Sequence, residues 1–165
     1  MKNIWLVVPC YNEEEVLPET SRQLKAVMQS MIDSGKISPE SKIAFVNDGS
    51  KDNTWNIISA LCTDDGIFAG INLSRNKGHQ NALLAGLMTA KKYADAVISL
   101  DADLQDDVDA IEKMVDNFIA GDDIVYGVRS SRKKIHSSNA SPQRDSINHG
   151  GNGVEIVFNH ADYSS

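Results

Sequence analysis

Five short runs of apolar residues divide the first part of the chain. They are rich in β-branched residues and lack polar alternation, a pattern typical of strands buried on both faces of a sheet. The runs are Ile4–Val8, Ile43–Val46, Ile67–Leu73, Ala96–Leu100 and Ile124–Val128. We therefore predict five strands in a central, buried sheet.

Amphipathic segments lie between these runs. The first begins near Pro18, keeps its apolar residues on one helical face and ends near Gly35, which suits a helix stop. In the second, Asp52 can cap a helix whose apolar residues include Ile58. Both segments predict helices that pack one face against the sheet.

Two further helices are predicted from the same spacing. One lies around Asn81–Tyr93 and presents Leu84, Leu87 and Met88, and the other begins after Asp106, a candidate cap. Strands alternating with helices predict an α/β fold with a mainly parallel central sheet covered by helices on both faces. In such folds ligands bind beyond the carboxyl ends of the strands.

The pattern changes after Ser130. There the chain becomes rich in Ser, Asn and Gly without apolar periodicity, which indicates a loop or a disordered segment. A short alternating group, Val154–Phe158, is typical of one last strand. We therefore predict a domain over residues 1–134, a loop or disordered segment over 135–153 and a short strand-like end over 154–165.

Composition supports one globular domain. The chain has 165 residues, and 41% hydrophobic residues are enough for a sizeable core. Its 16 Lys and Arg against 23 Asp and Glu give a formal charge of −7, which argues against a nucleic-acid partner. Cys10 and Cys62 have neither zinc-site nor disulfide-scaffold spacing, and we expect them to be reduced core residues. The apolar run near the start is too short for a signal peptide or a membrane span, so we expect a soluble domain.

Polar motifs follow the first two predicted strands. Pro9, Tyr11 and Glu13 come after the first strand, and Asp48 and Gly49 come after the second. Carboxylates at these positions can accept hydrogen bonds from a nucleobase N–H or from ribose hydroxyls, and an aromatic ring can pack on a base. Turn and capping chemistry alone also explains each motif taken singly.

An acidic motif follows the fourth predicted strand. Asp101 and Asp103 are two residues apart, so in extended chain both carboxylates point the same way and can approach one hard divalent cation. Gln105 offers a further oxygen. A solvated, acidic entry to a helix remains an alternative for such a short motif.

A basic loop follows the third predicted strand. Arg75, Lys77, Gly78 and His79 stand just before a predicted helix, an environment that suits phosphate oxygens. His79 can equally be a capping or packing residue.

Taken together, these motifs resemble those of family 2 glycosyltransferases, most closely the dolichyl-phosphate mannosyltransferase and bactoprenol glucosyltransferase branch. The residues that carry the resemblance are Pro9-x-Tyr11-Asn12-Glu13, Asp48-Gly49-Ser50-x-Asp52, Leu73-Ser74-Arg75-Asn76-x-Gly78-His79-Gln80 and Asp101-x-Asp103-Leu104-Gln105-Asp106. The likeness covers residues 3–134. It implies a GT-A fold with a Rossmann-like nucleotide-binding sheet, and transfer of a sugar from a UDP- or GDP-sugar with inversion at the anomeric carbon.

The resemblance also implies roles for individual residues. The nucleoside site is implied to consist of Pro9, Tyr11, Glu13 and Asp48. The ligands of Mg²⁺ or Mn²⁺ are implied to be Asp101, Asp103 and Gln105. The candidate catalytic residues are Asp103 and Asp106, and Arg129, in a Gly-x-Arg segment, is expected to reach phosphate.

The implied acceptor is a polyprenyl phosphate, which is largely dianionic at neutral pH and needs no strong protein base. A hydroxyl acceptor would need a base, for which Asp106 is the candidate. We expect a cytoplasmic location at the inner face of the membrane, with peripheral contact through a basic run, Arg132–Lys134, although a solvated loop explains that run as well.

Three other function classes are alternatives to this interpretation. A phosphoacceptor receiver domain shares the alternating pattern but is disfavoured, because the acidic residues and the His-Gln loop are spread over four strand ends. A dinucleotide-dependent oxidoreductase is disfavoured because no G-x-G-x-x-G turn follows the first strand. A truncated, catalytically incompetent module that binds a nucleotide-sugar or a partner protein stays open, because membrane-acting members of the family continue into an acceptor-binding segment and transmembrane helices.

Overall fold

The computed structural model describes residues 1–104, 108–121, 124–128, 134–138 and 154–159, with side chains described in the first two of these ranges. The elements in chain order are β1 (Ile4–Cys10), α1 (Leu17–Asp33), β2 (Lys42–Asp48), α2 (Thr54–Asp64), β3 (Phe68–Leu73), α3 (His79–Ala90), β4 (Ala96–Ser99), α4 (Asp109–Ile119), β5 (Ile124–Val128), β6 (Lys134–Ser138) and β7 (Val154–Asn159). The predicted alternation of strands and helices is confirmed from β1 to β5.

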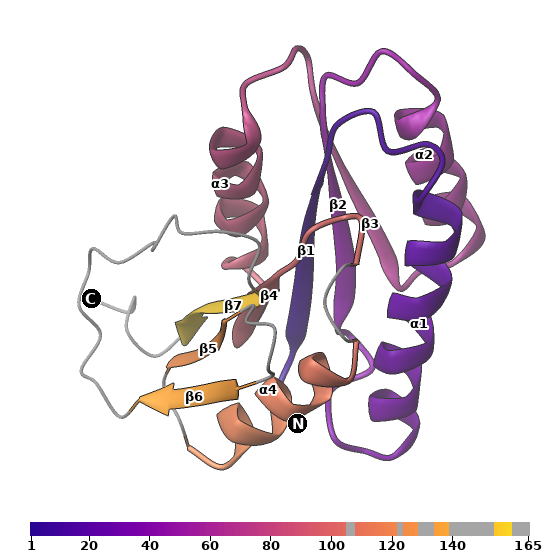
Figure 1. The fold of residues 1–165 in the computed structure, drawn as a ribbon. Helices are drawn as coiled ribbons and strands as arrows, with labels where there is room; N and C mark the ends of the chain where they lie inside the picture. Colours follow the sequence, from indigo (N-terminus) through magenta and orange to yellow (C-terminus); the bar gives the residue numbers. More distant parts are fainter. Residues whose placement is uncertain (105–107, 122–123, 129–133, 139–153, 160–165) are drawn as a thin grey trace.

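The strands of the described residues form one sheet in the order β3-β2-β1-β4-β7-β5-β6 (Figure 1). β1 pairs in parallel with β2 and with β4, and β2 pairs in parallel with β3. β7 is antiparallel to both β4 and β5, and β6 is antiparallel to β5. The prediction of a mainly parallel sheet is therefore confirmed, with β6 and β7 running against the other strands.

Helices cover both faces of this sheet, as predicted. Every residue of β1 is buried, and alternate side chains point to opposite faces. Leu6 belongs to the core under α1, α2 and α4, whereas Val7 belongs to the core under α3 (Figure 1). β1 is thus the centre of the domain, with a hydrophobic core packed on each of its two faces.

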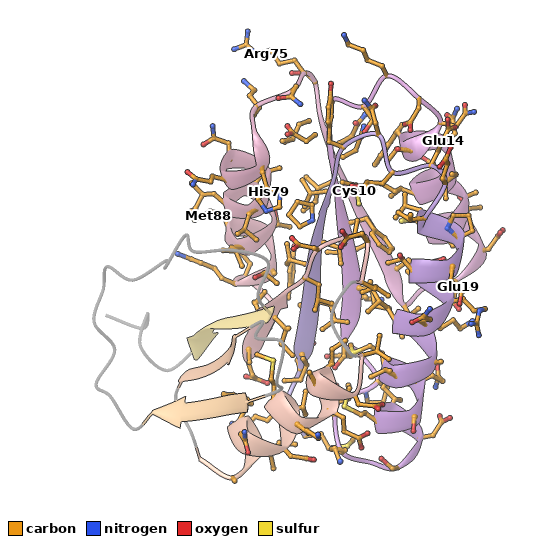
Figure 2. All side chains as sticks on the ribbon, viewed as in Figure 1. Cys10, Glu14, Glu19, Arg75, His79 and Met88 are labelled. Carbon is orange, nitrogen blue, oxygen red and sulfur yellow. The ribbon has the colours of Figure 1, made fainter. Side chains whose placement is uncertain are left out.

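The predicted apolar face of α3 is partly wrong. Leu87 is buried, but Leu84 and Met88 are 48% and 50% exposed, and Figure 2 shows Met88 on the outer side of the helix. The buried face instead carries small residues, among them Gly86, where an added Cβ would come within 2.4 Å of Val7 Cγ1. Close packing of α3 on the sheet therefore favours small side chains on the inner face.

Two other expectations differ from the structure. The predicted loop over 135–153 is wrong in its first part, because β6 extends to Ser138 as the edge strand paired with β5. An edge strand has a single neighbour and does not need a continuous apolar run. The N-cap position of α2 is Asn53 rather than Asp52, although the Asp52 carboxylate accepts the backbone N–H of Thr54 at the helix start (2.9 Å).

The predicted cap of α4, Asp106, lies outside the described residues, and α4 begins at Asp109. Among the helices that the structure describes, none combines the length and the apolar character needed to cross a membrane.

Candidate functional site

A pocket of about 380 Å³ lies beyond the carboxyl ends of β1, β2 and β4. This is the point where the strand order reverses, since β2 and β3 lie on one side of β1 and β4 lies on the other. The lining residues are Pro9, Cys10, Tyr11, Glu13, Asp48, Asn76, Gly78, His79, Asp101, Ala102 and Asp103. Figure 2 shows His79 at the start of α3 and Cys10 at the end of β1, toward the upper end of the sheet in this view.

The structure brings most of the predicted site residues into this one pocket. They are Pro9, Tyr11, Glu13, Asp48, Asp101 and Asp103. The other three, Gln105, Asp106 and Arg129, lie outside the described residues. Residues that were singled out from separate motifs of the chain thus share one cavity.

Cys10, predicted from the sequence to be a core residue, also lines the pocket. It is 1% exposed, and its thiol contacts the carbonyl oxygen of Val8. Burial raises the pKa of the Cys10 thiol, and the charge of Glu13 raises it further. A thiol held in its protonated form is a poor nucleophile, so Cys10 contributes to the shape of the pocket.

Asp48 ties the end of β2 to the loop after β3. Its side chain is 3% exposed, and its Oδ1 accepts the backbone N–H of Lys77 at 2.7 Å. A carboxylate can accept more than one hydrogen bond, so Asp48 can hold this loop and also receive an N–H group of a ligand.

Gly49 allows the same two loops to approach closely. Its φ is +65°, and a Cβ at this position would lie 2.2 Å from Asn76 N and 2.4 Å from Arg75 C. These neighbours are backbone atoms that cannot rotate away. A glycine is therefore required here by both conformation and space.

The loop after β1 is tied in turn to the loop after β2. Asn12 N–H donates to Ser50 Oγ (2.9 Å), and Lys51 N–H donates to Asn12 Oδ1 (2.8 Å). Asn12 has a φ of +52°, a left-handed conformation that asparagine tolerates better than most residues. Glu13 N–H donates to the buried Thr54 Oγ1 (2.9 Å). The pocket residues on either side of Asn12 are thus held by fixed backbone.

Negative charge gathers at one end of the pocket. Partial burial raises the pKa of the Glu13 carboxyl, and the charges of Asp103, Asp52 and Asp101 raise it further. His79 Nε2 lies 4.0 Å from Asp101 Oδ1. A cation between these carboxylates would relieve their repulsion.

The carboxylates of the pocket could hold a metal ion only together with a bound ligand. Within the described residues no group of three or more His, Cys, Asp and Glu side chains is arranged to hold a metal. Asp101 and Asp103 line the pocket together, and Mg²⁺ is commonly bound by one or two carboxylates plus the phosphates of a substrate. The residues present therefore fit a divalent cation that shares its coordination with a bound diphosphate.

Glu13→Gln is expected to stabilise the metal-free protein at neutral pH. The pKa of Glu13 is raised in the folded state, so its ionised form lowers the free energy of unfolding above that pKa. Below about pH 3 the side chain is protonated in the folded and unfolded states, and the difference should vanish. Thermal unfolding in EDTA should show a higher Tm for the variant at pH 7, on the order of 1–2 °C, and an equal Tm in acid.

Glu15→Gln is the matched control, since Glu15 is exposed and lies outside the pocket lining. A lower Tm for Glu13→Gln at pH 7, or an equal gain at both pH values, would contradict the electrostatic interpretation of this cluster.

Comparison with known proteins identifies the family of this chain. The family model described as glycosyl transferase family 2 matches residues 5–159. The uncharacterized glycosyltransferase YkoT of Bacillus subtilis (strain 168) is 45% identical over 161 residues, which cover 96% of this chain and 47% of that protein. The bactoprenol glucosyl transferase of Shigella phage SfV is 40% identical over 130 residues, which cover 78% of this chain and 39% of that protein.

Solved structures share the fold. The glucosyl-3-phosphoglycerate synthase of Mycobacterium tuberculosis, in complex with Mn²⁺, UDP and glucosyl-3-phosphoglycerate, has a TM-score of 0.50 and 18% identity, and the match covers 76% of this chain and 42% of that chain. The fold is accordingly the Rossmann-like GT-A fold. The chain spans less than half the length of each of these relatives. Because the family model matches nearly the whole chain, the chain belongs to glycosyl transferase family 2.

Proposed function

We propose that the pocket binds a UDP- or GDP-sugar together with a divalent cation, and that the protein transfers the sugar with inversion to an acceptor. The observation that carries the proposal is the convergence of Pro9, Tyr11, Glu13, Asp48, Asp101 and Asp103 on one cavity at the switch point of the sheet. Nucleotides bind at this position in open α/β sheets.

The nucleoside is proposed to lie over the ends of β1 and β2. Tyr11 is 43% exposed beside the pocket, so its ring is available to pack on a base. Asp48 is buried and fixed by the Lys77 backbone, so its carboxylate is oriented before a ligand arrives. A buried carboxylate can accept the ring N–H of uracil or of guanine.

The diphosphate is proposed to lie between the start of α3 and the acidic motif. Gly78 and His79 line the pocket at the N-terminus of α3, where the positive end of the helix dipole favours an anion. Asp101 and Asp103 would hold Mg²⁺ or Mn²⁺, with Gln105 as a proposed third ligand. When bound, the cation would neutralise the negative charge that develops on the departing nucleoside diphosphate.

A polyprenyl phosphate is the proposed acceptor. The bactoprenol glucosyl transferase relative supports this class by its name. The dianionic phosphate of such an acceptor is itself a nucleophile, so the protein need only orient it and exclude water. Asp106 and Arg129 are proposed as further site residues, as base for a hydroxyl acceptor and as phosphate ligand respectively. We propose that this reaction takes place at the cytoplasmic face of a membrane.

Asp48→Asn is expected to weaken donor binding roughly tenfold or more, because a hydrogen bond to a charged group contributes about 1.5–3 kcal/mol. The amide oxygen of asparagine can still accept the Lys77 N–H, so the fold should be retained. Calorimetric titration of the variant with the nucleoside diphosphate would measure the loss. An unchanged Kd would remove Asp48 from the nucleoside site.

Transfer itself is tested with a radiolabelled donor, undecaprenyl phosphate in detergent, and Mn²⁺. Labelled lipid as product would establish transfer to a polyprenyl phosphate. Metal-dependent donor binding without any labelled lipid or donor hydrolysis would instead favour a donor-binding module without catalysis.

A further inference from the structure

Thr20 is a polar residue on the buried face of α1. It lies near the start of the helix and is 3% exposed, beside apolar neighbours such as Leu17 and Leu24. Burying a hydroxyl costs free energy unless it forms a hydrogen bond, and threonine is not a strong helix former. The burial of this hydroxyl therefore calls for a hydrogen-bond acceptor.

The hydroxyl of Thr20 donates its hydrogen bond to an acceptor outside its own helix. It donates to the backbone carbonyl oxygen of Ala102 at 2.6 Å, in a buried contact between residues 82 positions apart. Thr63 and Thr89, on other helices, behave in the usual way and donate to the carbonyl oxygens four residues earlier. Thr20 thus connects α1 to the loop after β4.

Ala102 stands between the two carboxylates of the acidic motif. Its side chain is 3% exposed, so its methyl group is held in the core while its carbonyl is held by Thr20. That carbonyl belongs to the planar peptide that joins Ala102 to Asp103. A hydrogen bond to this oxygen restrains the peptide plane. The same plane contains the Asp103 nitrogen, so the bond also restrains the direction in which the Asp103 side chain leaves the backbone.

The turn that carries these carboxylates has an unfavourable conformation. Leu104 N–H donates to Asp101 O at 3.2 Å, and Leu104 has a φ of +43°, which is uncommon for a bulky residue. A left-handed non-glycine residue persists only where the surroundings hold it. The Thr20 hydrogen bond is one such constraint, because it acts on the middle of the same turn.

We propose that Thr20 is a positioning residue that sets the geometry of Asp101 and Asp103 for a shared divalent cation. This inference rests on the proposed function, because the proposed function assigns the cation to these two carboxylates. Groups that orient metal ligands from behind typically change metal affinity by about 10- to 100-fold when they are removed. Thr20 would act in a comparable way, through the carbonyl oxygen of Ala102, which stands between the two proposed ligands.

The test measures UDP binding by calorimetry with Mn²⁺ and with EDTA for the wild type and three variants. Thr20→Val keeps the shape and removes the hydroxyl, Thr20→Ser keeps the hydroxyl, and Thr89→Val makes the same chemical change within α3, outside the pocket lining. We expect Thr20→Val to lose roughly tenfold in affinity with Mn²⁺ but little in EDTA. Thr20→Ser and Thr89→Val should stay close to the wild type in both conditions.

Two results would overturn the role of Thr20 while leaving the proposed function intact. One is wild-type Mn²⁺-dependent binding by Thr20→Val, and the other is an equal loss in Thr20→Ser, which would indicate packing instead of the hydroxyl. If Thr20→Val does not fold, Thr20→Ala provides the same loss of the hydroxyl with a better helix former. UDP binding by the wild type that is absent, or equal in Mn²⁺ and EDTA, would instead overturn the proposed metal site and this inference together.

Discussion

Asp103→Asn is expected to weaken Mn²⁺-dependent binding of the sugar nucleotide by roughly 100-fold, equivalent to about 2.7 kcal/mol. Asp103 shares the pocket with Asp101, and its charge contributes to the raised pKa of Glu13. The amide has no negative charge and is a weaker ligand for a hard cation than a carboxylate. Calorimetric titration with Mn²⁺ and with EDTA would show that the metal-dependent part of the affinity is lost.

The control for this variant is Asp64→Asn. Asp64 is exposed at the carboxyl end of α2, whereas the pocket residue Glu13 is hydrogen-bonded to Thr54 at the start of that helix. The control should bind the donor as the wild type does. If both variants lose affinity equally, the effect is one of net charge, and Asp103 has no special place in the site.

Gly49→Ala is expected to lower the free energy of unfolding by about 2–4 kcal/mol and to abolish donor binding. The left-handed conformation alone costs roughly 1–2 kcal/mol for a residue with a side chain. The added Cβ would also lie 2.2 Å from Asn76 N, so the loop after β3 must move. Since that loop carries Asn76, Gly78 and His79 into the pocket, its displacement should disrupt the site.

Gly35→Ala separates the cost of the left-handed conformation from the cost of the steric clash. Gly35 also has a positive φ, +75°, but an added Cβ there would meet no atom within 4 Å. Thermal or urea unfolding should therefore show a clearly smaller loss for Gly35→Ala than for Gly49→Ala. Equal losses would mean that the contact between the two loops does not constrain the fold.

The strands and the place of the site could be predicted because both follow from local patterns. A strand buried on both faces needs a continuous apolar run, and the predicted run Ile43–Val46 lies within β2, where every residue from Ile43 to Asp48 is buried. The carboxyl ends of parallel strands meet at one edge, so motifs such as Tyr11 to Glu13 and Asp101 to Asp103 could be expected to share a cavity.

Contacts between distant loops could not be predicted in this way. The bond between Asp48 and the Lys77 backbone joins residues 29 positions apart, and no periodicity marks either partner. Thr20 fits the helical pattern as an ordinary polar residue, and only its hydrogen bond to Ala102, 82 positions away, points to the proposed role. The position of β6 depends on its pairing with β5. The polar sequence of this edge strand carries no pattern from which that pairing could be predicted.

The pocket is proposed to be a metal-dependent site for a sugar nucleotide. The most direct test of this proposal is calorimetric titration of the wild-type chain with UDP-glucose, UDP-N-acetylglucosamine and GDP-mannose, each in Mn²⁺ and in EDTA. We expect that one donor binds in Mn²⁺ and that EDTA weakens its binding at least about tenfold. Failure of every donor to bind, or binding that EDTA leaves unchanged, would contradict it.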